Sequence, residues 1–378
     1  MRNGKFDDIR PYYDEEIPSA MSRILQSEHF PLLASYVYPG KNIDELKALI
    51  GTFKTIADFQ LEVMRCVNEQ VIARSSTSFT YSGIDKLDPD KKYLFISNHR
   101  DIMLDSSLLQ YILYKNGHDT SEITFGANLM SGQLVIDIGR SNKMFRVERG
   151  GNMKEFYKAS LHLSEYIRYV ITEKGQSVWI AQRNGRTKDG NDLTDQGIIK
   201  MFCMSGSGDK VKDLVDLNIV PVSVSYEWEP CDILKAVELY SSRKEKYVKR
   251  PGEDLNSILT GILQPKGAIH FSFGAPITEE QLAAYSDSPS SEYHKSVAKL
   301  FDDQIISNFR LSSNNYIAYD MLTGADEFAE KYTPQQKAMF EKNMSKLGEY
   351  NVDEPDVLKE IFLGIYANPV ENAKKLNR

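Results

Sequence analysis

Residues 92–114 read KYLFISNHRDIMLDSSLLQYILY, and this stretch joins two apolar segments of different period through a polar turn. KYLFIS is a short run of apolar and aromatic residues, which predicts a buried strand. DSSLLQYILY repeats apolar residues at three- and four-residue spacing, which predicts a helix. A strand that leads directly into a helix is the repeating unit of α/β proteins.

The same alternation continues toward the C-terminus. Residues 152–175, NMKEFYKASLHLSEYIRYVITEKG, predict a long helix, because Asn152 is a suitable cap, Glu155 follows three residues later and Gly175 is a suitable end. Five further apolar runs predict strands: EITFGA (122–127), KMFRVER (143–149), SVWIAQ (177–182), NIVPVSVSYE (218–227) and GAIHFSFGAPI (267–277). We therefore expect an α/β core at residues 80–280, with a largely parallel sheet flanked by helices.

Helical patterns lie on both sides of this core, so we expect an N-terminal helical region at residues 1–79 and a C-terminal one at 281–378. Within the first, residues 45–73 place apolar residues at helical spacing from Leu46 to Ile72. We expect this apolar face to pack on the rest of the protein, and a membrane-binding face is the alternative.

Composition excludes several classes of protein. The chain has 378 residues and a net charge of −7, so a broad nucleic-acid-binding surface is not expected. Its three cysteines are far apart, which argues against a disulfide framework or a zinc site and favours a reducing compartment. No apolar run is long enough for a signal peptide or a membrane span. We expect a cytoplasmic protein, peripheral on the inner face of a membrane.

Polar residues follow the predicted strands, where ligands bind in open α/β sheets. His99 follows the first strand and is suited to act as a general base near neutral pH. Its carboxylate partner is either Asp105, one helical turn into the next element, or Asp101. Arginines and a lysine follow two later strands beside glycine turns, an arrangement suited to an anionic substrate. These cations are Arg149, Arg183, Arg186 and Lys188.

Four segments together resemble the glycerolipid acyltransferase superfamily, which includes glycerol-3-phosphate and 1-acylglycerol-3-phosphate acyltransferases. The family's four blocks are a His followed by an Asp, an aromatic-rich strand ending in Arg, a Glu-Gly-x-Arg-Ser type turn and an apolar strand with a central Pro. The matching segments are SNHRDIMLDSSLLQYIL (97–113), KMFRVERGG (143–151) with GANL upstream, RNGRTKDG (183–190) and IVPVSVSYE (219–227). Their order and spacing match over residues 80–280.

Two positions depart from the family's pattern. The spacing from His99 to Asp105 is one residue longer than the family's, and Asn184 stands where a glutamate is expected. Asn184 can hydrogen-bond a hydroxyl or an amide but carries no charge.

The resemblance implies a role for each matching residue. His99 would be the general base and Asp105 its orienting partner. Arg149 and Arg186 would bind the acceptor phosphate. Arg183, Asn184, Gly185 and Lys188 would belong to the same substrate-binding loop, and Pro221 would line the acyl-donor side. No metal, cofactor or covalent acyl-enzyme is implied, since the acyl group would pass directly from acyl-CoA or acyl carrier protein.

The sequence therefore predicts an acyltransferase that acts on a hydroxyl of a glycerol-phosphate or lysophospholipid at a membrane surface. An amino-acid-based lysolipid is an alternative acceptor. A binding protein is the alternative to an enzyme: an acyltransferase-like protein that binds lipid or a partner without catalysis. Asn184, in place of the expected glutamate, is the reason to keep this alternative. A kinase is excluded, because no glycine-rich loop precedes HRD and no DFG follows it.

Overall fold

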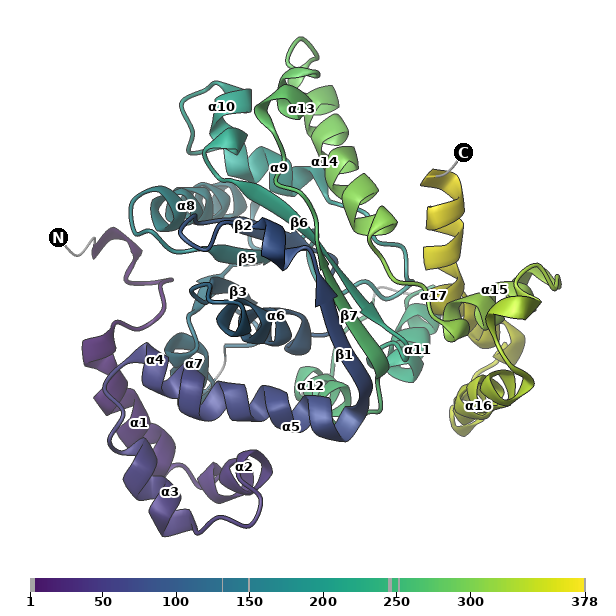
Figure 1. Ribbon diagram of the computed structural model, residues 1–378, viewed down its shortest axis with the longest axis horizontal. Coiled ribbons are helices and arrows are strands. Elements are labelled where there is room, and N and C mark those ends of the chain that lie inside the picture. The colour runs from purple at the N-terminus through teal and green to yellow at the C-terminus, as the bar shows by residue number, and fades with distance from the viewer. Residues whose placement is uncertain (1–3, 131, 149, 244–246, 251, 377–378) are drawn as a thin grey trace.

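A seven-stranded sheet forms the centre of the computed structural model, which describes residues 4–376 except 131, 149, 244–246 and 251 (Figure 1). The spatial order of the strands is β1-β7-β6-β2-β5-β3-β4. β6 and β7 are antiparallel, and all other neighbours are parallel. The strands are β1 (Ser76–Ser82), β2 (Leu94–Ser97), β3 (Glu122–Gly126), β4 (Met144–Val147), β5 (Val178–Ala181), β6 (Ile219–Tyr226) and β7 (Gly267–Phe273). The predicted α/β class with a largely parallel sheet is confirmed.

Helices cover both faces of the sheet because successive strand residues point to opposite sides. Leu94 and Ile96 of β2 pack under one group of helices, whereas Phe95 packs under the other. The first group is α8 (Met153–Thr172), α9 (Gln196–Cys203), α10 (Lys210–Val215), α13 (Glu279–Ala283) and α14 (Ser290–Ser307). The second group is α5 (Arg65–Ser75) and α6 (Leu104–Lys115), with α12 (Glu253–Leu263) against α5.

The N-terminal helices pack on the core through their apolar faces. They are α1 (Ile17–Gln26), α2 (Phe30–Val37), α3 (Ile43–Ile50), α4 (Ile56–Phe59) and a π-helical turn (Gln60–Met64), and they share a cluster with α7 (Gln133–Ser141). The amphipathic pattern at 45–73 is not one helix. It breaks after Ile50, and Thr55 caps a new helix by accepting from the backbone N–H of Asp58 (3.1 Å).

The C-terminal helices form a separate cluster at one end of the sheet (Figure 1). Phe340, Phe362 and Tyr366 pack ring against ring at its centre. The helices are α11 (Asp232–Ser242), α15 (Ser313–Thr323), α16 (Pro334–Met344) and α17 (Pro355–Leu376). Short 3-10 turns occur at Gly4–Phe6, Asp14–Glu16, Ile84–Lys86, Ala329–Lys331 and Ser345–Glu349. None of the helices in the described ranges is both long and apolar enough to cross a membrane.

Candidate active site

His99 lies directly after β2, at the carboxyl edge of the sheet. Its Nδ1 is hydrogen-bonded to Oδ2 of Asp105 at 2.9 Å, and both side chains are buried. The longer spacing between the two residues is accommodated by a turn at 101–103, which places Asp105 in the first turn of α6. The ring of Trp179 from β5 meets the imidazole edge to face at 5.6 Å and limits its rotation.

The Asp105 carboxylate is held by three donors besides His99. Its Oδ2 accepts from the backbone N–H groups of Arg100 (2.6 Å) and Asp101 (2.9 Å), and its Oδ1 accepts from the Tyr226 hydroxyl (2.8 Å). A carboxylate is acceptor-only, so Nδ1 of His99 carries the shared proton. Nε2 is then left with the lone pair that a general base needs.

Asp101 has a different part in this turn. Its Oδ1 accepts from the backbone N–H groups of Met103 (2.9 Å) and Leu104 (2.8 Å), so it caps the start of α6. Its Oδ2 is buried without a hydrogen-bond partner among the described residues. Burial, together with the nearby charge of Asp105, raises the pKa of Asp101. Asp105, and not Asp101, is the residue that contacts the imidazole.

A neutral cluster of buried charges fixes the backbone beneath His99. Arg100 is only 1% exposed and donates to Asp192 and, from Nη1, to Glu229 (3.1 Å). Lys235 donates to Glu229 (2.5 Å) and to the Arg100 carbonyl (2.7 Å). Burial alone would lower the pKa of Arg100. The Asp192 and Glu229 carboxylates outweigh this effect and hold the pKa of Arg100 above its ordinary value.

The loop after β5 is tied to the same turn. The backbone N–H of Thr187 donates to the His99 carbonyl at 2.7 Å, and the Thr187 hydroxyl donates to Asp192 at 2.7 Å. Asn98 donates to Asp192 (3.1 Å) and exchanges two hydrogen bonds with the backbone of Val224 in β6. The first, third and fourth sequence blocks therefore meet at one place.

A cavity of about 310 Å³ opens in front of His99. It contains five of the predicted residues of the loop after β5, namely Arg183, Asn184, Gly185, Arg186 and Lys188. Its other walls come from the end of β3, from Trp179, from Leu239 of α11, from Lys249 before α12 and from Asp254 in the first turn of α12. The cavity thus combines a base with several cations, which suits an anionic substrate that carries a hydroxyl.

The cations of this cavity differ in how they are paired. Nη1 of Arg186 is buried and has no hydrogen-bond partner within the described residues. Lys188 instead donates to Glu238 of α11, and Lys249 donates to Asp254. Arg183, whose Nη1 donates to the Asn191 carbonyl at 3.5 Å, and Arg186 are therefore the cavity cations with no acidic hydrogen-bond partner among the described residues.

Arg149 lies outside the described residues, so its predicted role stays a prediction. Pro221 is buried inside β6, where it pairs with Ile96 and its carbonyl accepts from Gly274, and it is not among the residues that line the cavity. Its part on the acyl-donor side stays a prediction.

Several residues of the site carried no signal of their own in the sequence. Tyr226 lies in the fourth block and Trp179 in an apolar run, and neither was predicted to belong to the site. Asp192 and Glu229 looked like loop acids. Only the adjacency of β2, β5 and β6 in the sheet shows that these side chains converge on the His99 turn.

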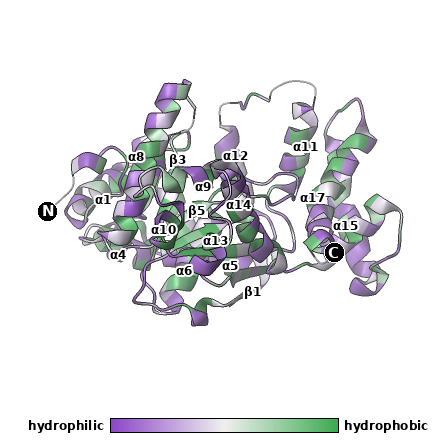
Figure 2. Ribbon diagram, turned by 90° about the horizontal axis from the view of Figure 1, so that it is seen from above, coloured by the Kyte–Doolittle hydropathy of each residue, from purple (hydrophilic) through white to green (hydrophobic). Residues whose placement is uncertain are grey.

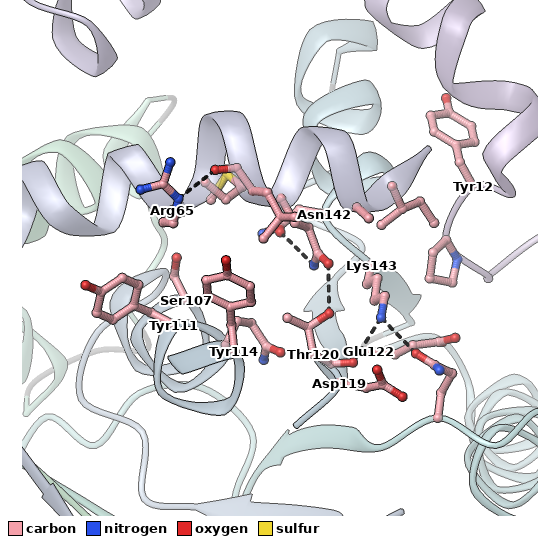
Figure 3. Close-up of a pocket in the computed structure, with 18 of the residues that line it drawn as sticks. Tyr12, Arg65, Ser107, Tyr111, Tyr114, Asp119, Thr120, Glu122, Asn142 and Lys143 are labelled. Atoms are coloured by element: carbon pink, nitrogen blue, oxygen red, sulfur yellow. Dashed lines mark hydrogen bonds between the residues drawn. The ribbon is translucent and has the colours of Figure 1, made fainter. Parts of the chain in front are cut away.

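A larger cavity, of about 510 Å³, lies at the opposite edge of the sheet (Figure 3). It is lined by Tyr111 and Tyr114 of α6, by the π-helical turn and by residues that precede β3, β4 and β5. Ligands of open α/β sheets bind beyond the carboxyl ends of the strands, so this amino-edge cavity is not the predicted active site. In the described ranges no group of three or more His, Cys, Asp or Glu residues is arranged to hold a metal ion.

Lys143 in the wall of this amino-edge cavity makes stability depend on pH. Its Nζ donates to the Thr120 carbonyl (3.0 Å) and to Gln176 (2.8 Å), and burial lowers the pKa of Lys143 to about 8 (Figure 3). Between pH 8 and the ordinary pKa of 10.5, the unfolded chain keeps a proton that the folded protein has released. The free energy of unfolding should therefore rise with pH in this window, by up to about 3 kcal/mol.

Urea unfolding at pH 7.5 and pH 10 checks this expectation, with Lys143→Met as the comparison. The variant has no group to titrate at this position, so the wild type should gain stability relative to it as the pH rises. Parallel pH dependences of the two proteins would contradict the assignment.

One family model matches the central part of the chain. Residues 78–225, from within β1 almost to the end of β6, match the family model described as Acyltransferase. A search of curated proteins found no match. One solved structure of similar fold is the 1-acyl-sn-glycerophosphate (LPA) acyltransferase PlsC from Thermotoga maritima. The match has 11% identity and a TM-score of 0.38, and it covers 76% of this chain and 92% of that one.

The predicted resemblance to the glycerolipid acyltransferase superfamily is therefore confirmed. Residues 78–225 therefore form a domain of the acyltransferase family.

Proposed function

We propose that this acyltransferase moves a fatty acyl group from acyl-CoA or acyl carrier protein to a hydroxyl of a glycerol-phosphate or lysophospholipid. The observation that carries the proposal is the His99–Asp105 pair at 2.9 Å, facing a cavity that Arg186 also lines. The pair supplies a base for the hydroxyl, and the arginine supplies a donor for the phosphate.

The proposed reaction is direct transfer. Nε2 of His99 takes the proton of the acceptor hydroxyl as its oxygen bonds to the thioester carbonyl carbon. The carbon–sulfur bond then breaks, and the leaving thiolate takes the proton from the imidazolium. Asp105 steadies the imidazolium between the two steps, and Tyr226 and two backbone N–H groups hold Asp105 in place. The proposal needs neither a metal nor a covalent acyl-enzyme.

An acyl-transfer assay with purified protein tests the proposal. Long-chain acyl-CoA and acyl carrier protein are each offered with glycerol 3-phosphate, with its monoacylated form and with an amino-acid-based lysolipid, and lipid products are identified by mass spectrometry. Product with one pair establishes the reaction and identifies the acceptor. If the protein binds a lysolipid but acylates none, the binding function without catalysis is the correct one, and Asn184 at the cavity wall is the first residue to revert to glutamate.

Arg186→Ala should weaken binding of the acceptor more than binding of the acyl donor. A charge-assisted hydrogen bond contributes about 1.5–3 kcal/mol, so the KM for a phosphate-bearing acceptor should rise roughly 10- to 100-fold. Lys188→Ala is the matched control, because Lys188 is already paired with Glu238 and should matter less. Steady-state kinetics with each substrate varied in turn separates the two KM values. An equal rise in both would contradict the role of Arg186.

A further inference from the structure

The C-terminal helices contact the loop that carries the predicted substrate-binding residues. We call residues 183–192 the β5 loop, because they follow β5 and form part of the wall of the active-site cavity. α11 and α17, which lie side by side in Figure 1 and in Figure 2, both reach this loop. The contact from α11 is the ion pair of Lys188 with Glu238. Both helices lie outside residues 78–225, which match the acyltransferase family.

Two asparagines of α17 donate hydrogen bonds to the β5 loop. Nδ2 of Asn368 donates to the Asp189 carbonyl at 2.7 Å, and Nδ2 of Asn372 donates to Oδ1 of Asn191 at 3.1 Å. The two asparagines are four residues apart in the helix, so they lie on the same face, one turn from each other. One face of α17 therefore lies along the loop.

The loop and the helix approach each other most closely at Gly190. This residue is buried and has a φ of +76°, and a Cβ at its position would lie 2.0 Å from the Ile365 carbonyl oxygen. Any side chain there would force the loop away from the helix. Pro369, four residues after Ile365 in α17, has no N–H to donate to that carbonyl. Gly190 and Pro369 together therefore allow the loop to pack directly on the backbone of α17.

α17 is itself fixed relative to the His99 turn. The Tyr366 hydroxyl donates to Oδ2 of Asp232 at 2.8 Å and accepts from the backbone N–H of Glu229 at 3.1 Å. Glu229 is the residue whose carboxylate accepts from Arg100, directly after His99. The helix therefore holds the loop at a defined place with respect to the imidazole.

We propose that α17 positions the β5 loop for acceptor binding, through Asn368 and through the contact of Ile365 with Gly190. A loop that is ordered before the ligand arrives loses less conformational freedom on binding, so the affinity is higher. Asn368 is a positioning residue, because it touches the loop backbone and is not among the described residues that line the cavity. The link to the acceptor rests on the proposed function, whereas the ordering of the loop does not.

Hydrogen exchange followed by mass spectrometry tests the ordering of the loop. The variant is Asn368→Ala, and Asn343→Ala is the matched control, because Nδ2 of Asn343 donates to Asp232 at 2.7 Å within the same cluster of helices. We expect amide exchange in peptides that cover residues 183–192 to rise about 2- to 12-fold in Asn368→Ala, the factor of one net hydrogen bond. The control should exchange like the wild type there. Equal exchange of the loop in the two variants would overturn the proposal.

Gly190→Ala is a second variant, directed at the backbone contact. Its control is Gly175→Ala, because Gly175 also has a positive φ (+69°) but a Cβ there would meet no described atom within 4 Å. Both variants strain a left-handed residue, whereas only Gly190→Ala separates the loop from α17. We expect exchange of residues 183–192 to rise roughly tenfold or more in Gly190→Ala alone. The same rise in Gly175→Ala would contradict the role of the contact.

Steady-state kinetics connects the loop to the acceptor. Asn368→Ala should raise the KM for the acceptor about 2- to 12-fold and leave kcat and the KM for the acyl donor within about twofold. A merely structural role would lower the amount of active enzyme, and hence the apparent kcat, with both KM values unchanged. An active enzyme whose acceptor KM does not change in Asn368→Ala would overturn the role of α17 in acceptor binding. If the exchange results are as expected but the wild type acylates no acceptor, the ordering of the loop by α17 stands and the proposed function fails.

Discussion

Replacing His99 by alanine is expected to lower the rate of acyl transfer by roughly 10²–10⁴-fold, the usual contribution of a general base. The protein should remain folded. Asp105, which loses the imidazole, keeps its bonds to Tyr226 and to the backbone N–H groups of Arg100 and Asp101, so no buried charge is left without partners. The measurement is the single-turnover rate at saturating acyl donor and acceptor, with circular dichroism as the test of folding.

His118→Ala is the matched control for this variant. His118 is also partly buried and also next to an aspartate, Asp119, but it lines the amino-edge cavity. Its replacement should leave the rate within about twofold, far below the contribution of a base. If both the His99 variant and His118→Ala keep full turnover, His99 is not the base and the proposed mechanism is wrong.

Arg100→Met is expected to destabilise the protein by about 3–5 kcal/mol, the cost of removing one partner from a buried ion pair. The variant leaves Asp192 and Glu229 buried with only Lys235 to balance them. Urea unfolding measures the loss. Arg65→Met is the control, since Arg65 pairs with Glu69 at the surface and such pairs contribute about 0–1 kcal/mol.

The pairing can be checked by a second change in the same cluster. Asp192→Asn removes the charge that Arg100→Met leaves unbalanced, so the double variant should lose less than the sum of the two single variants. Strict additivity would show that Arg100 stabilises the fold independently of Asp192, through other contacts such as the Phe309 ring at 5.1 Å.

The sequence predicted the fold class because, in the central region, short apolar runs typical of buried strands alternate clearly with apolar residues at helical spacing. It missed β1, because STSFTYS is largely polar and exposed and its first residues fall in the region 1–79 that was expected to be helical. As an edge strand with only β7 as its partner, β1 buries little apolar surface, so local pattern could not reveal it. The boundaries at residues 79 and 280 stay predictions, and the sheet itself runs from Ser76 to Phe273.

The candidate site was predictable in part for a similar reason. His99, Asp105 and the loop at 183–188 are adjacent in sequence to strands, so their place at one sheet edge follows from topology. The choice between Asp105 and Asp101 did not follow, because it depends on the path of the six residues 98–103 between β2 and α6. Tyr226, Asp192 and Glu229 reach the His99 turn from distant parts of the chain, and only the order of the strands brings them there.

The bond from the Thr187 N–H to the His99 carbonyl has a consequence for selectivity. It connects the loop that carries Arg186 to the residue that carries the imidazole, so under the proposed function a phosphate bound by that loop would lie at a nearly fixed distance from Nε2. This distance would select acceptors by the number of bonds that separate their phosphate from the reacting hydroxyl. Two acceptors whose free hydroxyl lies on different carbons would then react at different rates, because only one places its hydroxyl next to Nε2. This selectivity would not depend on the length of the acyl chain.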